Sequence, residues 1–121
     1  MPIREIPKTD WMQVCKNLSQ QHEGAPVTVE VLGADAGTRE LARDVPLEGI
    51  TAERKRGAYV VEVFLGEAED RHLSHVVSRP VHMRIRESET GEHEALQIES
   101  ENRATTTILF GPPGSKQEPQ A

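Results

Sequence analysis

The stretch Ala58-Tyr-Val-Val-Glu-Val-Phe-Leu65 is the most hydrophobic strand-like run in the chain. Its β-branched and aromatic residues favour extended strands over helices. Two further runs have the same character, Val27-Thr-Val-Glu-Val-Leu-Gly33 and Ala104-Thr-Thr-Thr-Ile-Leu-Phe110. Short strands of this kind, joined by short connections, predict that the chain between Pro26 and Phe110 forms an antiparallel sheet.

Turn residues separate the strand-like runs. Ala34-Asp-Ala-Gly37 is a turn candidate that follows the run Val27 to Gly33. Arg54-Lys-Arg-Gly57 is a charged turn before the run Ala58 to Leu65. Pro46-Leu-Glu-Gly-Ile50 places Pro and Gly inside a strand-like region, which predicts a bend or bulge where the sheet curves. Near the end of the sheet, Glu101-Asn102 is expected to turn a hairpin.

One amphipathic helix precedes the strands. Apolar residues recur at positions i, i+3, i+4 and i+7 from Trp11 to Leu18, which is the spacing of one helix face. Thr9 or Asp10 is suited to cap its start. Gly24 and Pro26 are residues that typically end a helix.

The fold class follows from these elements. A chain of 121 residues has room for one domain with one core. We expect residues 1–110 to form an α+β domain, with one N-terminal helix and a bent antiparallel sheet or small barrel of about five to seven strands. Residues 111–121 contain no aliphatic side chain larger than alanine and are expected to be a disordered tail.

Charge and cysteine content limit the classes of function. Acidic residues outnumber basic ones 20 to 14, which gives a net charge of −6. This balance argues against broad, non-specific binding to nucleic acid or to an anionic membrane, although it permits a local basic patch. The single cysteine, Cys15, allows no intrachain disulfide. Without the apolar core of a signal peptide or a membrane-length apolar run, we expect a cytoplasmic protein.

Basic residues form two groups that are candidates for binding. One group is a dense cluster at an expected turn, and the other is a stripe on one face of an expected strand, where it could contact phosphate, carboxylate or an acidic partner. An alternative is that the neighbouring strand, which carries Glu94, Gln97 or Glu99, satisfies the arginines through opposite charges across the strands. The cluster consists of Arg54, Lys55 and Arg56, and the stripe consists of His82, Arg84 and Arg86.

The segment Asp70-Arg-His72-Leu-Ser-His75 combines residue types found in metal and catalytic sites. The surrounding Leu and Val residues indicate a strand, in which alternation would point His72 and His75 to opposite faces. Cys15 lies on the apolar helix face, which favours a buried hydrophobic role over a nucleophile. We therefore predict no catalytic residue, no metal ligand and no cofactor.

Several short blocks also occur in a characteristic order. They are Arg4-Glu-Ile-Pro7 with Trp11, His22-Glu-Gly24, Val27 to Gly33, Pro46 to Ile50, His72 to His75, and Ala95-Leu-Gln-Ile-Glu-Ser100. In this order the chain resembles, over nearly all of residues 1–110, a family of small bacterial proteins whose domain has no known function. The resemblance implies a bacterial origin and a stand-alone domain. It supplies no established activity and no binding residues that could be carried over to this chain. The expected architecture is also similar to the Sm-like and SH3-like small barrels.

Three hypotheses for function follow, in order of preference. The first is a non-enzymatic protein-binding or assembly module that associates with another protein or with itself through its strand edges. The second is nucleic-acid or nucleotide binding through the basic patch. The least favoured is a metal-dependent enzyme that uses His72, His75 and a carboxylate.

Overall fold

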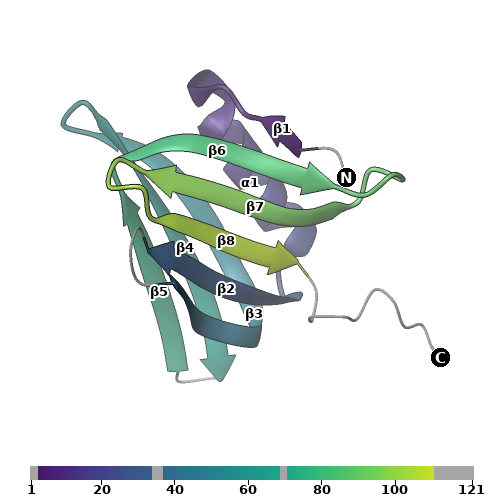
Figure 1. Ribbon diagram of the computed structural model, residues 1–121. Coiled ribbons are helices and arrows are strands. Elements are labelled where there is room, and N and C mark those ends of the chain that lie inside the picture. The colour runs from purple at the N-terminus through teal and green to yellow at the C-terminus, as the bar shows by residue number, and fades with distance from the viewer. Residues whose placement is uncertain (1–2, 34–36, 69–70, 111–121) are drawn as a thin grey trace.

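The computed structural model describes residues 3–33, 37–68 and 71–110, which form one α-helix and eight strands (Figure 1). A short 3-10 turn, η1 (Lys8–Asp10), leads into the helix α1 (Trp11–His22). The strands are β1 (Ile3–Glu5), β2 (Pro26–Gly33), β3 (Gly37–Lys55), β4 (Ala58–Ala68), β5 (Arg71–Ser78), β6 (Pro80–Glu87), β7 (His93–Ser100) and β8 (Thr105–Phe110). The tail predicted for residues 111–121 lies outside the described residues.

All eight strands belong to one antiparallel sheet in the order β1-β6-β7-β8-β2-β3-β4-β5. The α+β class, with one helix before a bent antiparallel sheet, is confirmed. The prediction of five to seven strands was too low, and the sheet is open, with β1 and β5 at its edges, rather than a closed barrel. The additional strand is β1, which pairs Ile3 with Arg86. Local sequence carries no signal for a partner so far along the chain.

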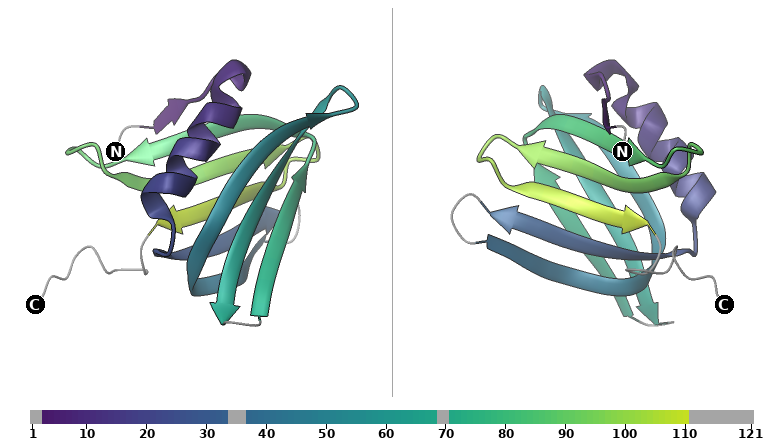
Figure 2. Two further views of the ribbon diagram at one scale, coloured as in Figure 1. Left: turned by 180° about the vertical axis from the view of Figure 1, so that it is seen from behind. Right: turned by 45° about the vertical axis from the view of Figure 1, so that its right-hand side comes forward.

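The bend predicted at Pro46–Ile50 is confirmed in the middle of β3. This strand is 19 residues long. Its first part, through Pro46, pairs with β2, and its second part, from Leu47 onward, pairs with β4. The register shifts between Leu47 and Gly49, as a bulge requires. Figure 2 shows the result: the second part of β3 forms a layer with β4 and β5, and this layer crosses the strands β6, β7, β8 and β2.

The apolar face that the sequence predicted for the helix is the face that is buried. Trp11, Cys15 and Leu18 are the buried residues of α1, and Asp10 stands at its N-cap without a side-chain capping hydrogen bond. The buried position predicted for Cys15 is confirmed, and burial raises the pKa of its thiol to about 12. No helix among the described residues is long and apolar enough to cross a membrane.

Two turns at the same end of the sheet differ in geometry. Arg56 and Gly57 both have positive φ, at 55° and 83°, and form the two-residue loop between β3 and β4. The turn predicted at residues 54–57 is therefore confirmed. The hairpin predicted at Glu101-Asn102 is confirmed, since β7 and β8 pair antiparallel on either side of it. Its loop has three residues rather than two, because Ser100 N–H donates to the Ala104 carbonyl and residues 101–103 lie between them. The third of these, Arg103, has the left-handed φ of 73° that such a loop requires.

Candidate functional site

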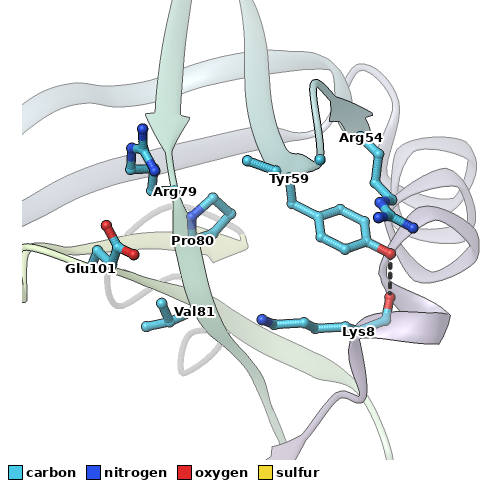
Figure 3. Close-up of a pocket in the computed structure, with 9 residues that line it drawn as sticks. Lys8, Arg54, Tyr59, Arg79, Pro80, Val81 and Glu101 are labelled. Carbon is cyan, nitrogen blue, oxygen red and sulfur yellow. Dashed lines mark hydrogen bonds between the residues drawn. The ribbon is translucent and has the colours of Figure 1, made fainter.

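A pocket of about 510 Å³ lies at the end of the molecule where these turns meet the junction of β5 and β6 (Figure 3). Figure 3 shows Lys8, Arg54 and Tyr59 on one side of the pocket, with Arg79 and Glu101 on the other. The full lining consists of Lys8, Arg54, Gly57, Ala58, Tyr59, Arg79, Pro80, Val81 and Glu101.

Aromatic packing fixes one wall of the pocket. The rings of Trp11 and Tyr59 meet edge to face with centroids 4.9 Å apart. Trp11 Nε1 donates to the Ile6 carbonyl at 2.8 Å, and Tyr59 Oη donates to the Lys8 carbonyl at 3.2 Å. These bonds hold η1 against β4, so the backbone of Lys8 has a defined place in the wall.

Three cationic side chains surround the pocket. Lys8 Nζ lies 5.9 Å from the ring centroid of Trp11, and the Arg54 guanidinium lies 5.8 Å from that of Tyr59. Among residues 3–33, 37–68 and 71–110, neither these two cations nor Arg79 forms an ion pair. Since Glu101 is the one carboxylate in the described lining, the pocket is positively charged.

Backbone geometry places Arg79 in this position. It is the single residue between β5 and β6, and its φ is 53°, in the left-handed region. Its carbonyl accepts a hydrogen bond from Glu101 N–H at 2.9 Å, which ties the junction to the β7–β8 turn. Guanidinium and ammonium groups around an apolar floor of Pro80 and Val81 suit a ligand with a carboxylate or phosphate group.

Of the six residues proposed from sequence, Arg54 alone lines this pocket. Lys55 Nζ lies 3.6 Å from Glu53 Oε1, and Arg56 is exposed at the tip of the β3–β4 loop. The structure therefore divides the dense basic cluster between a pocket wall and a solvent-exposed turn.

The other three candidates lie on β6, where carboxylates contact them. Glu5 of β1 accepts from Arg84 Nε at 3.0 Å and lies 2.8 Å from His82 Nδ1. The hydrogen bond with His82, followed by the attraction of Arg84, holds the pKa of the Glu5 carboxyl below its ordinary value. Glu5 was not among the partners predicted from the sequence, because no strand was predicted for residues 3–5.

Strand β7 supplies the remaining partners of the stripe. Arg84 Nη1 donates to Glu99 Oε1 at 3.3 Å, and Arg86 Nε lies 3.3 Å from Glu94 Oε1. Neutralisation by carboxylates of the neighbouring strand is confirmed for Glu94 and Glu99. The stripe is thus a set of ion pairs across three strands rather than an open basic surface.

The two histidines of β5 point away from each other, as strand alternation predicted. His72 Nδ1 lies 2.7 Å from Glu48 Oε2, and His75 Nε2 lies 3.2 Å from Thr106 Oγ1. Burial, followed by the charge of Arg39, lowers the pKa of His75. No cluster of three or more His, Cys, Asp or Glu side chains in the described part of the chain is arranged to hold a metal ion.

A different histidine pair was not foreseen from the sequence. His22 Nε2 lies 3.0 Å from His93 Nδ1, and the ring of His22 stacks on Phe110 with centroids 4.3 Å apart. These residues come from the end of α1, the start of β7 and the end of β8.

The pocket residues Lys8, Tyr59 and Arg79 were also not predicted from the sequence. They lie far apart along the chain, and only the folded sheet brings them together.

Comparison with known proteins gives one match. The model of a family of unknown function, DUF5335, matches residues 2–119. No curated protein and no solved structure matches the chain. The resemblance to a family of unknown function, inferred from the order of short sequence blocks, is confirmed. The match covers nearly the whole chain, and the protein therefore belongs to the DUF5335 family.

Proposed function

We propose that this chain is a non-enzymatic binding module that holds an acidic group of a partner protein in the pocket between Lys8, Arg54 and Arg79. The observation that carries the proposal is that these three cations share one pocket without an ion pair among the described residues. The pocket is thus a local positive site on a chain whose net charge is −6.

The contrast with the β6 stripe strengthens this reading. There, Arg84 already contacts Glu5 and Glu99. A ligand would have to displace these internal partners before it could bind, which would offset much of the gain. At the pocket, an incoming carboxylate would displace no ion-paired carboxylate of the described residues, and charge-assisted hydrogen bonds are stronger than neutral ones.

The aromatic wall favours a compact acidic group over a nucleic-acid strand. Strand-binding proteins present open aromatic faces on which bases stack, along a basic groove that follows the backbone. Here the guanidinium of Arg54 lies over the Tyr59 ring, and the edge-to-face contact with Trp11 occupies another side of it. Carboxylates also neutralise the β6 stripe, so it offers no open basic groove beside the pocket.

The chemistry of the described side chains supports binding rather than catalysis. In that part of the chain, His75 with Thr106 is the one histidine in hydrogen-bond contact with a hydroxyl. No described carboxylate orients the ring of His75, whose lowered pKa reflects burial and the nearby charge of Arg39. Among the described residues, His75 and Thr106 therefore lack the third, orienting group of a catalytic triad.

Fluorescence anisotropy with a labelled oligoglutamate peptide at low salt tests the proposal. We expect Arg54→Gln and Arg79→Gln each to weaken binding by about threefold or more, because each removes a charge-assisted contact. Arg43→Gln is the matched control, since it makes the same charge change at an exposed residue paired with Glu40 at 2.9 Å.

Two results would overturn this assignment. One is unchanged peptide affinity in both pocket variants. The other is tighter binding of a labelled single-stranded RNA than of the peptide, with the same sensitivity to Arg54→Gln and Arg79→Gln. The second result would identify the pocket as a nucleic-acid site.

A further inference from the structure

The two edges of the sheet differ in how they are protected. Edge strands usually carry charges, prolines or bulges that prevent pairing with another chain. Strand β1 has three residues, and its Arg4 and Glu5 are both ion-paired. Strand β5 has eight residues and pairs only with β4. Its segment 72–78 contains no Lys, Arg, Asp, Glu or Pro, so it lacks the usual protection.

The hydrogen-bond pattern shows which groups of β5 face outward. In a two-residue loop the closing residues, here Lys55 and Ala58, bond to each other, and the pattern then alternates along β4. Every second residue of β4, starting at Tyr59, therefore bonds toward β5. The β5 partners of these residues are Leu73, His75 and Val77. The residues whose N–H and C=O groups point to the open edge are His72, Ser74, Val76 and Ser78.

A second contact confirms this alternation. The same pattern directs the N–H and C=O of Ile50, on β3, away from β4. Ser19 Oγ of α1 lies on that side, 2.7 Å from Ile50 N and 2.9 Å from Ile50 O. The outward backbone groups of β3 are thus those that the loop geometry predicts, and the same reasoning holds one strand further on.

We propose that a second copy of this chain pairs with β5 in the antiparallel sense, about a two-fold axis that passes through His75. In this register Ser74 lies opposite Val76 of the second copy, and His72 lies opposite Ser78. All four outward-facing residues then meet outward-facing residues, as an antiparallel ladder requires. The interface is isologous and closes on itself as a dimer.

Several features favour a second copy as the occupant. Val76 and Leu73 are exposed by 49% and 39%, and the pairing places Leu73 opposite Val77 of the other copy. A groove of about 260 Å³ borders this edge, between β5 and the strands β2 and β8, and leaves room for incoming side chains. Because each copy carries a net charge of −6, a ladder formed by segment 72–78, which contains no Lys, Arg, Asp or Glu, adds no charge of its own to their repulsion.

Sedimentation velocity over a wide concentration range, with circular dichroism to check folding, tests the pairing. Wild-type protein is expected to dimerise. Val76→Lys and Val76→Glu should each weaken the dimer by about tenfold, because the two new charges lie diagonally across the axis. An equal mixture of the two variants should restore dimers, since opposite charges then meet. Met12→Lys, at an exposed residue of α1, is the control and should leave the dimer unchanged.

A second variant pair tests the backbone contact itself. Ser74→Pro removes one outward N–H that the dimer uses and that β4 does not, and edge strands accept proline at such positions. It should weaken the dimer, whereas Ser74→Ala should not. A wild-type protein that stays monomeric at all concentrations would overturn the proposal. A dimer that tolerates both Val76→Lys and Ser74→Pro would also overturn it, by placing the interface elsewhere.

Discussion

The hydroxyl of Ser19 contacts both backbone polar groups of Ile50. Its oxygen accepts a hydrogen bond from Ile50 N–H at 2.7 Å and lies 2.9 Å from the Ile50 carbonyl oxygen, with the Cys15 carbonyl at 2.8 Å as a second acceptor. Beyond Pro46, β3 has no strand on this side. One helix side chain therefore satisfies backbone groups that a strand would otherwise have paired.

Ser19→Ala tests the importance of this contact. The alanine leaves the N–H of Ile50 without its partner, beside a side chain that is only 1% exposed. We expect the free energy of unfolding to fall by about 1–3 kcal/mol, the typical result of leaving a buried donor unpaired. Urea denaturation measures the change. Gln20→Ala, one residue further along α1 at an exposed position, should change stability by less than about 0.5 kcal/mol.

The His22 and His93 pair predicts that acidification destabilises the fold. Burial, and then the charge of His93, lowers the pKa of His22 from its ordinary value of 6.5. The unfolded chain therefore takes up a proton before the folded protein as the pH falls. The stability that depends on neutral His22 is complete above the unfolded pKa and is lost as the pH falls through the folded pKa.

Urea denaturation at about pH 7.5 and about pH 5.5 checks this sign. Stability should be lower at the acidic pH, and His22→Gln should reduce the difference without abolishing it, since His75 shifts in the same direction. The pKa of Glu5 is lowered from 4.5, so its contribution is lost at still lower pH and does not interfere. Stability that rises on acidification would contradict the assignment.

The β3–β4 loop predicts opposite effects for two neighbouring substitutions. Gly57 has a φ of 83°, where a Cβ is strained even though no atom lies near it. Gly57→Ala should therefore destabilise the protein by roughly 1 kcal/mol. Arg56 occupies the left-handed region at 55°, where asparagine is tolerated better than arginine. Arg56→Asn should raise the thermal unfolding midpoint, and a decrease would show that the Arg56 side chain has a stabilising partner.

Thiol reactivity provides a direct test of the α1 packing. Cys15 has no exposed surface, and burial raises its thiol pKa to about 12. The native protein should react with a thiol reagent such as DTNB no faster than it unfolds, and it should react promptly in urea. Rapid reaction of the native protein would mean that α1 separates readily from β3.

Elements with a periodic local pattern were predictable from the sequence. The buried face of α1 follows from the spacing of Trp11, Cys15 and Leu18, and the bend in β3 follows from Pro and Gly within a strand-like run. Strand β1 was missed because its pairing with Arg86 depends on the completed sheet. The Glu101-Asn102 hairpin was predicted correctly, but its loop is one residue longer than expected, because the choice between two-residue and three-residue loops depends on the register of β7 with β8.

In the candidate site, too, the residues with a local sequence signal were predictable, and those placed by the folded sheet were not. Charge density singled out Arg54, which lines the pocket, together with Lys55 and Arg56, which do not. Nothing local distinguishes Arg79, whose position depends on its left-handed φ between two strands. The carboxylates of β7 that pair with the β6 stripe could be predicted from the sequence, because β6 and β7 are consecutive strands. The partner Glu5 could not, because it lies on β1, whose pairing with β6 has no local signal.

The position of β2 in the sheet has a consequence for the order of assembly during synthesis. One neighbour of β2 is β3, which follows it immediately, and the other is β8, which ends at Phe110. On the ribosome, β2 therefore has an unpaired edge until almost the whole described chain has emerged. Val27 and Val29 are fully buried in the finished protein and would be accessible throughout that interval. We expect truncated or stalled chains that lack β8 to aggregate through this edge.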